Sequence, residues 1–264
     1  MKTEVRKNKI IELLKRDGSV RVGTLSKLLG VSEVTVRNYL ADLEEKGLLS
    51  RVCGGAVFSY KPYYSMNFNQ RLNTNRTQKE KIAKCAAALV EPDDTIMLNA
   101  GTTTLLLFRS LPSDYRLNIL TNSISVALES LSNPNFNVKL VGGAVNAKYQ
   151  FTYGDEAIDM LRNYHATKVF LSVDGIDFEH GFSTYHEEGT RAERAMIEQS
   201  ETVIVVGDST KCHRRAFASV APLGKADIIV TDYRPTPLEI KQAKQNGISF
   251  VHPDGDVNTP KEKV

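Results

Sequence analysis

This 264-residue sequence contains few cysteines and no long apolar run. Cys53, Cys85 and Cys212 are widely spaced and form no CxxC pair, which argues against a disulfide framework or a zinc knuckle. No window approaches the ~18 consecutive apolar residues that a membrane span requires. The N-terminus alternates charged and apolar residues, unlike a signal peptide. We therefore expect a cytoplasmic protein that does not associate with membranes.

Signatures of nucleotide binding and of metal catalysis are also missing. Neither a Walker motif nor a GxGxxG motif occurs, so a nucleotide is not indicated. The five histidines show no paired metal-ligand spacing, and nothing resembles HExxH. The sequence therefore predicts no metal site and no cofactor.

The positive charge is unevenly distributed along the chain. The net charge is only +3, but residues 1–57 carry 11 Lys and Arg against 7 Asp and Glu, whereas the remaining residues carry 23 against 24. An excess of positive charge in the first fifth of the chain is expected if that part faces DNA phosphates. A solvated basic helix would fit the same charge, so this observation alone decides little.

Apolar residues at helical spacing predict three short helices in the basic region. The first covers residues 4–16 and stops at Asp17-Gly18, and residues 19–22 form a short strand. The second is capped by Thr24 and ends at Gly30, which suits a tight turn. Its predicted inward face consists of Leu25, Leu28 and Leu29.

The third helix carries the predicted DNA contacts. Ser32 is a favourable N-cap, the helix ends at Gly47, and a β-hairpin wing follows around Gly54-Gly55. Its inward residues are Val36, Leu40 and Leu43. Side chains that point outward near the N-terminus of such a helix enter the major groove, where Arg suits guanine and Asn suits adenine. The candidate DNA-binding residues are Ser32, Glu33, Thr35, Arg37 and Asn38, with Arg51 on the wing.

A protein-interaction module would have the same core, but the order of turn, cap and wing favours DNA binding. These residues resemble the DeoR family of bacterial regulators. The resemblance rests on Val20–Ser26, on Val31-Ser32-x-x-Thr35-Val36-Arg37, and on Arg51-x-x-Gly54-Gly55-Ala56. The family usually has Arg-Arg-Asp-Leu where this chain has Arg37-Asn38-Tyr39-Leu40. This departure lies on the recognition helix and affects base preference.

From residue 95 onward, short β-branched runs alternate with helical stretches, which is typical of a parallel sheet covered by helices. The predicted organisation is a winged helix-turn-helix domain (1–58), a linker (59–78), an α/β effector domain (79–257) that opens with a helix over Lys79–Val90, and a polar tail (258–264). The predicted strands are Thr95–Leu98, Leu117–Leu120, Val138–Val141, Lys168–Val173, Thr202–Val206, Ile228–Val230 and Ile248–Val251.

Six of these runs lead directly into polar residues or glycine. Turn chemistry explains any one such loop, but ligands bind beyond the carboxyl ends of parallel strands, so six loops favour one shared crevice. Gly101–Thr104 opens a helix and offers backbone N–H groups to a phosphate, and Lys211 adds a positive charge. The candidate effector-binding residues are Gly101, Thr102, Thr103, Thr104, Asn122, Gly142, Gly143, Asp174, Gly175 and Lys211.

The same family resemblance extends over this second half. It rests on an ordered set of short motifs that includes Arg71, Gly101-Thr102-Thr103, Thr121-Asn122-Ser123, Gly142-Gly143 and Asp208-Ser209-x-Lys211. The resemblance implies a domain similar to ribose-5-phosphate isomerase and glucosamine-6-phosphate deaminase that binds a phosphorylated sugar or sugar derivative. It also implies a repressor of a carbohydrate-metabolism operon that its effector releases from DNA. The family usually has Lys at the position of Glu193, before Arg194.

The alternative function is a sugar-phosphate isomerase or deaminase that carries a DNA-binding domain. Such an enzyme needs a base beside the substrate carbon, for which Asp174 and Asp177 are candidates, and Cys212 next to Lys211 is a candidate reactive thiol. Each is equally well explained as a turn residue or a buried thiol. We therefore expect no catalytic residues and a regulator that binds double-stranded operator DNA as a homo-oligomer, dimer or tetramer.

Overall fold

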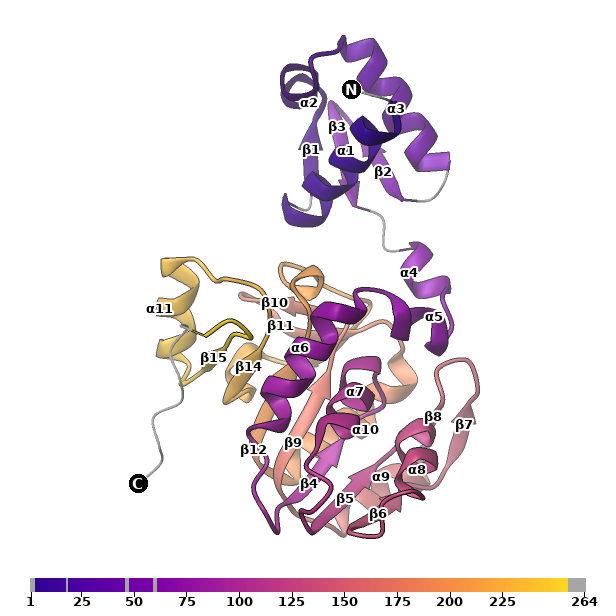
Figure 1. Ribbon diagram of the computed structural model, residues 1–264, viewed down its shortest axis with the longest axis vertical. Helices are drawn as coiled ribbons and strands as arrows, with labels where there is room; N and C mark the ends of the chain where they lie inside the picture. The colour runs from indigo at the N-terminus through magenta and orange to yellow at the C-terminus, as the bar shows by residue number, and fades with distance from the viewer. Residues whose placement is uncertain (1–2, 18, 46–47, 59–60, 256–264) are drawn as a thin grey trace. The chain divides into compact units, whose positions relative to one another are not determined.

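The computed structural model describes residues 3–17, 19–45, 48–58 and 61–255, which divide into two compact units between Asn67 and Phe68 (Figure 1). The predicted helix ends at Gly18 and Gly47 lie outside the described residues, as does the tail 258–264. Within the described ranges, no helix combines the length and the apolar character needed to cross a membrane.

The first unit is a winged helix-turn-helix domain. A three-stranded antiparallel sheet of order β1-β3-β2 packs with three helices, and the short helix α4 (Lys61–Ser65) follows. Gly30 ends α2 in the left-handed conformation, and the Ser32 hydroxyl accepts a hydrogen bond from the Thr35 N–H, as the sequence predicts. The elements are α1 (Thr3–Asp17), β1 (Ser19–Arg21), α2 (Val22–Leu29), α3 (Glu33–Glu45), β2 (Leu49–Val52) and β3 (Gly55–Phe58).

Two details of α2 differ from the sequence prediction. The helix begins at Val22 instead of after Thr24, because β1 leads directly into it and the Val22 N–H donates to the Gly54 carbonyl at 2.9 Å. Leu28 is 57% exposed instead of buried. The inward face of this short helix consists of Val22, Leu25 and Leu29.

The second unit is an α/β domain whose seven-stranded sheet has the order β15-β14-β12-β9-β4-β5-β6 (Figure 1). All neighbouring strands in this sheet are parallel, so the carboxyl ends of all seven strands lie on the same side of the domain. The strands are β4 (Thr95–Leu98), β5 (Leu117–Thr121), β6 (Phe136–Leu140), β9 (Ala166–Ser172), β12 (Ser200–Val206), β14 (Ile228–Val230) and β15 (Ser249–Val251). The helices are α5 (Phe68–Asn73), α6 (Arg76–Ala87), α7 (Thr102–Ser110), α8 (Ile124–Ser130), α9 (Asp155–Arg162), α10 (Glu187–Glu198) and α11 (Pro237–Gln245).

Each central strand has apolar side chains on both of its faces. In β9, Phe170 packs with α6 and α7 on one face, whereas Val169 and Leu171 pack with α9 and α10 on the other. Side chains alternate along a strand, so a sheet covered on both faces requires unbroken apolar runs. This requirement explains why the seven strands are readable in the sequence, and it confirms the predicted α/β class.

The structure contains elements that the sequence did not predict. The segment interpreted as a linker holds α4 and α5, and α6 begins at Arg76 instead of Lys79. The α/β domain also contains two small antiparallel sheets. Their strands are β7 (Ala144–Asn146), β8 (Phe151–Tyr153), β10 (Gly175–Asp177), β11 (Gly181–Thr184) and β13 (Ala218–Ala221).

We expect residues 68–264 to fold when expressed alone, because the two apolar clusters of this unit contain only residues of this unit. A thermal melt followed by circular dichroism should give one cooperative transition. A fragment that is soluble but melts without a cooperative transition would contradict the division at Phe68.

Candidate functional site

Five of the six predicted DNA-binding residues lie at the start of α3, and the sixth, Arg51, lies on β2. Ser32, Glu33, Arg37 and Asn38 are exposed at the start of α3, and Thr35 is half-buried. Arg37 donates to the Glu33 carboxylate at 3.0 Å, and both side chains are more than half exposed. Glu33 thus orients the Arg37 guanidinium. Because this ion pair is exposed, breaking it so that Arg37 can contact a base would cost little free energy.

Arg51 on β2 is held by Glu44 of α3. Its Nε donates to Glu44 Oε2 at 2.6 Å, and its backbone N–H donates to Glu44 Oε1 at 2.7 Å. These two hydrogen bonds lower the pKa of Glu44. The ionised Glu44 carboxylate therefore connects β2 of the wing to α3.

Sequence reasoning missed two cations on the same surface. Arg21, at the start of α2, and Lys27 on α2 are exposed and line one hollow together with Arg37 and the wing residue Gly54. Their positive charges follow from the sequence, but their position beside the recognition helix depends on the packing of α2 against α3. Three basic side chains therefore lie around one hollow beside α3, together with the acidic Glu33.

The predicted effector loops all follow strands of the parallel sheet. Gly101, Thr102 and Thr103 follow β4 at the first turn of α7, where Gly101 is the N-cap residue. A Cβ atom on Gly101 would lie 2.4 Å from the Cβ of Ser172, so only glycine allows this loop to approach the end of β9. The loop after β4 is therefore in direct contact with the end of β9.

Two predicted ligand-binding groups are already used to hold these loops together. The Asn122 amide accepts a hydrogen bond from the Ala100 N–H at 2.8 Å and donates to the Thr152 carbonyl at 3.1 Å. The Thr104 hydroxyl donates to the Asn99 carbonyl at 2.7 Å. In this structure both side chains brace the backbone around the site.

Of the three remaining predicted glycines, Gly143 and Gly175 lie where backbone segments approach closely, whereas a Cβ on Gly142 would meet no atom within 4 Å. Gly142 and Gly143 follow the edge strand β6, and Gly143 has a φ of 127°. A Cβ on Gly175 would lie 2.3 Å from the Arg214 carbonyl oxygen. Gly175 therefore brings the loop after β12 against the end of β9.

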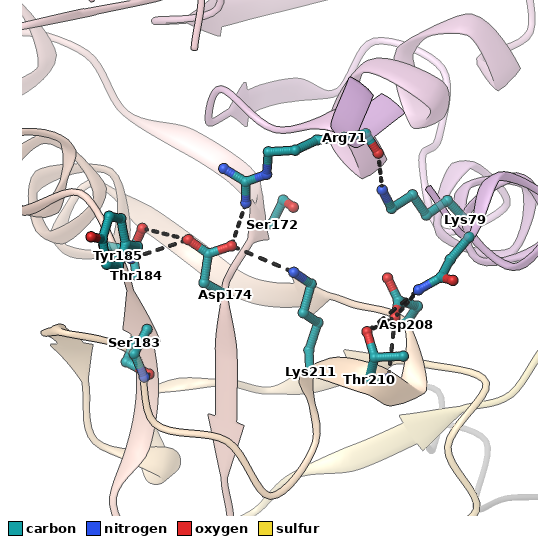
Figure 2. A network of polar contacts seen from close by, with 12 residues as sticks. Arg71, Lys79, Ser172, Asp174, Ser183, Thr184, Tyr185, Asp208, Thr210 and Lys211 are labelled. Carbon is teal, nitrogen blue, oxygen red and sulfur yellow. Dashed lines mark hydrogen bonds and ion pairs between the residues drawn. The ribbon is translucent and has the colours of Figure 1, made fainter. Parts of the chain in front are cut away.

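The centre of the site is the buried carboxylate of Asp174, which follows β9 (Figure 2). It forms an ion pair with Arg71 of α5, lies 3.5 Å from Lys211 Nζ, and accepts a hydrogen bond from the Tyr185 N–H at 3.1 Å. Burial alone would raise its pKa, but Arg71, Lys211 and Arg214 together hold the pKa of Asp174 well below its usual range. Asp174 is therefore ionised at neutral pH.

Lys211 and Arg214 are also buried, and Arg71 is partly buried. Burial lowers the pKa of Lys211 to about 7, because the attraction of Asp174 only partly offsets desolvation and the repulsion from Arg214 and Arg71. Lys79 of α6 donates from Nζ to the Arg71 carbonyl at 2.6 Å and so holds the end of α5. The cluster thus combines an ionised carboxylate with a concentrated positive charge.

Arg71 and Arg214 were absent from the predicted site. Arg71 belongs to the ordered motif set, but it lies 103 residues before Asp174 within the presumed linker. Its guanidinium carbon lies 5.4 Å from the centre of the Tyr149 ring, and His186 packs on the same ring at 3.8 Å between centroids. Arg214 could have been found from the sequence, because it lies three positions after the predicted Lys211.

The candidate catalytic groups have the wrong electrostatics for their proposed roles. Because Asp174 is paired with cations, it is a weak base. Burial would raise the pKa of Asp177, but hydrogen bonds from His180 and Glu179 lower it. Burial raises the pKa of the Cys212 thiol far above its usual value, so this thiol is unreactive. Among the described residues, no group of three acidic, His or Cys side chains is placed to hold a metal ion.

The fold and the two sites define a DNA-binding transcriptional regulator with a separate sensor domain. Residues 6–61 match the DeoR-like helix-turn-helix domain, and residues 74–233 match the DeoR C-terminal sensor domain. The chain belongs to the DeoR family.

Relatives of similar length are named as transcriptional regulators, not as enzymes. A protein from Escherichia coli O157:H7 named for repression of the aga operon is 37% identical over 94% of this chain and 93% of its own length. The transcriptional repressor GlcR of Bacillus subtilis (strain 168) is 30% identical over 94% and 95%. The glycerol-3-phosphate regulon repressor of Escherichia coli (strain K12) is 30% identical over 92% and 95%.

Solved structures with a similar fold cover about half of this chain. A ribose-5-phosphate isomerase A from Methanocaldococcus jannaschii is 18% identical with a TM-score of 0.39, and the match covers 52% of this chain and 55% of that chain. The eIF2B beta subunit from Chaetomium thermophilum is 11% identical with a TM-score of 0.43, over 59% and 48%. No residue role is carried over from either.

Replacing Asp174 by Asn should destabilise the protein strongly, because Arg71, Lys211 and Arg214 would lose the anion between them. Removing one partner of a buried ion pair costs about 3–5 kcal/mol. The matched control is Asp155→Asn, whose pair with Arg191 is exposed and contributes about 1 kcal/mol or less. Urea denaturation curves measure both changes, and equal losses would contradict the central role of Asp174.

Proposed function

We propose that this chain acts in the cytoplasm as a repressor of a carbohydrate-metabolism operon, and that a phosphorylated sugar or sugar derivative releases it from its operator. The printed names of relatives support this proposal, because they include a glycerol-3-phosphate regulon repressor and a repressor of the aga operon. The family description of residues 74–233 as a sensor domain supports a ligand-binding role for the α/β domain.

The observation that carries the proposal is the convergence of three basic side chains on the carboxylate of Asp174. Arg71, Lys211 and Arg214 face this carboxylate, and Asp208 is the other buried acid that acts on Lys211. A phosphate dianion beside Lys211 would accept charge-assisted hydrogen bonds from such side chains. The first turn of α7, with its outward N–H groups and positive dipole end, would bind the same anion.

Regulation then requires that the effector change the affinity for DNA. A dimer or tetramer would place two copies of α3 on operator half-sites, and effector binding would alter their spacing or mobility. In each copy, Ser32, Glu33, Thr35, Arg37 and Asn38 would contact bases or phosphates, and Arg51 would contact the backbone. Because coupling is reciprocal, operator DNA would weaken effector binding by the same factor.

Arg37→Ala should weaken operator binding and relax sequence preference, by about 1–3 kcal/mol if the contact to guanine is bidentate. Arg51→Ala should instead weaken operator and scrambled duplexes equally. Fluorescence anisotropy with both duplexes measures the two effects. Arg109→Ala serves as the control, because this exposed arginine pairs with Glu129 in the sensor domain. Unchanged operator affinity would remove Arg37 from the recognition set.

Lys211→Met and Thr102→Val should each weaken effector binding while operator binding without effector is preserved. Both changes keep most of the side-chain volume, and a lost charged hydrogen bond is worth about 1.5–3 kcal/mol, so affinity should fall by roughly one to two orders of magnitude. In a reporter assay both variants should remain on DNA at effector concentrations that release the wild type. Unchanged affinity in calorimetry would assign Lys211 a purely structural role.

A further inference from the structure

Glu193 of α10 is a buried acid that the proposed function does not use. It is 7% exposed, and its Oε1 accepts a hydrogen bond from the Asn99 side chain at 2.9 Å. Its Oε2 is buried and has no hydrogen-bond partner among the described residues. A buried polar atom without a partner costs free energy, so it calls for a functional explanation.

The Asn99 side chain connects the Glu193 carboxyl group to the loops of the candidate site. Asn99 follows β4, donates to the Ser172 carbonyl at 2.9 Å, and accepts from the Ser172 N–H at 2.8 Å. Ser172 packs against Gly101 and lies two residues before Asp174; Figure 2 shows its position beside Asp174 and Arg71. Glu193 therefore lies next to the end of β9, on which the Asp174 cluster is built.

The surroundings of Glu193 are opposite to those of Asp174. Burial raises the pKa of Glu193 to about 8, the Asn99 hydrogen bond and Arg194 oppose this increase, and the negative charge of Asp174 adds to it. In the absence of ligand the group is therefore mostly protonated at neutral pH. A cation that reached Oε2 would ionise it and form a charge-assisted hydrogen bond.

We propose that Glu193 binds an amino group of the effector, so that the effector of this chain is an amino-bearing sugar phosphate. This inference rests on the proposed function. The site then offers two oppositely charged ends, with cations for the phosphate and a carboxylate for the ammonium group. A hydroxyl group at the same place would form only a neutral hydrogen bond, which is weaker.

Binding would move one proton. The protonated carboxyl group gives its proton to the buffer, and the resulting carboxylate pairs with the ammonium group of the ligand. Lys211 and His186 also lie near Asp174, and burial lowers the pKa of both. Any protons that these two groups exchange on phosphate binding are common to amino and hydroxyl ligands, so a matched pair of ligands isolates the proton from Glu193.

The test uses the full-length chain and titration calorimetry. The probes are glucosamine 6-phosphate and galactosamine 6-phosphate, each paired with its hexose 6-phosphate and with its N-acetylated form, which has no charged amine. We expect the wild type to bind one amino sugar at least tenfold more tightly than its two matched forms. In Glu193→Gln this ratio should fall to near one, through loss of affinity for the amino sugar alone. Glu198→Gln, an exposed change on the same helix, should keep the ratio.

A second measurement uses only the wild type and so does not depend on how a variant folds. Titrations in two buffers of different ionisation enthalpy should reveal nearly one more proton released with the amino sugar than with its hexose phosphate at pH 7. Equal affinity for amino and hydroxyl forms, or an unchanged ratio in Glu193→Gln, would overturn the role of Glu193 while sugar-phosphate binding stands. Failure of every probe to bind would overturn the sugar-phosphate effector itself, and this inference with it.

Discussion

The buried carboxylate of Asp174 is the interaction on which the sensor site depends. It joins α5 through Arg71, the loop after β12 through Lys211, and the chain after β11 through the Tyr185 N–H. Buried ion pairs repay their desolvation only when the remaining hydrogen bonds are satisfied. Here two basic side chains and a backbone N–H converge on one carboxylate, so three segments far apart in the sequence acquire fixed positions from a single anion.

An anion that bound beside Asp174 would act on the first helix of the sensor domain. Arg71 lies in α5, whose first residue is also the first residue of the second unit, and Lys79 of α6 holds the Arg71 carbonyl. An anion bound in the cluster would compete with Asp174 for Arg71 and would therefore act on the segment that follows the DNA-binding unit in the chain. Allosteric control requires such an element whose contacts differ between the two states.

The sequence could predict the strands but not the cluster, for physical reasons. A sheet covered on both faces requires unbroken apolar runs, and such runs are visible at Thr95–Leu98 and Ile228–Val230 with the observed bounds. The antiparallel strands of the two small sheets in the second unit, each of three or four residues, leave no comparable pattern. Lys211 was identified from its own loop, whereas its meeting with Arg71 at Asp174 depends on tertiary packing that brings α5 to the carboxyl end of β9. Leu28 was misplaced because helical spacing alone does not tell which of three neighbouring leucines faces the core.

Asp174 and Glu193 are two buried acids near the same strand end whose charge states differ at neutral pH. Cations surround Asp174 and keep it ionised, whereas the nearest polar partner of Glu193 is a neutral amide and its nearest charged neighbours include Asp174 itself. The ionised Asp174 is a structural counter-ion, and a ligand would need an anionic group to compete with it for the surrounding cations. The protonated acid is open to a ligand that brings a positive charge. Because their partners differ, the two carboxyl groups would have different roles. The proposed effector would carry a negative charge at the end near Asp174 and a positive charge at the end near Glu193.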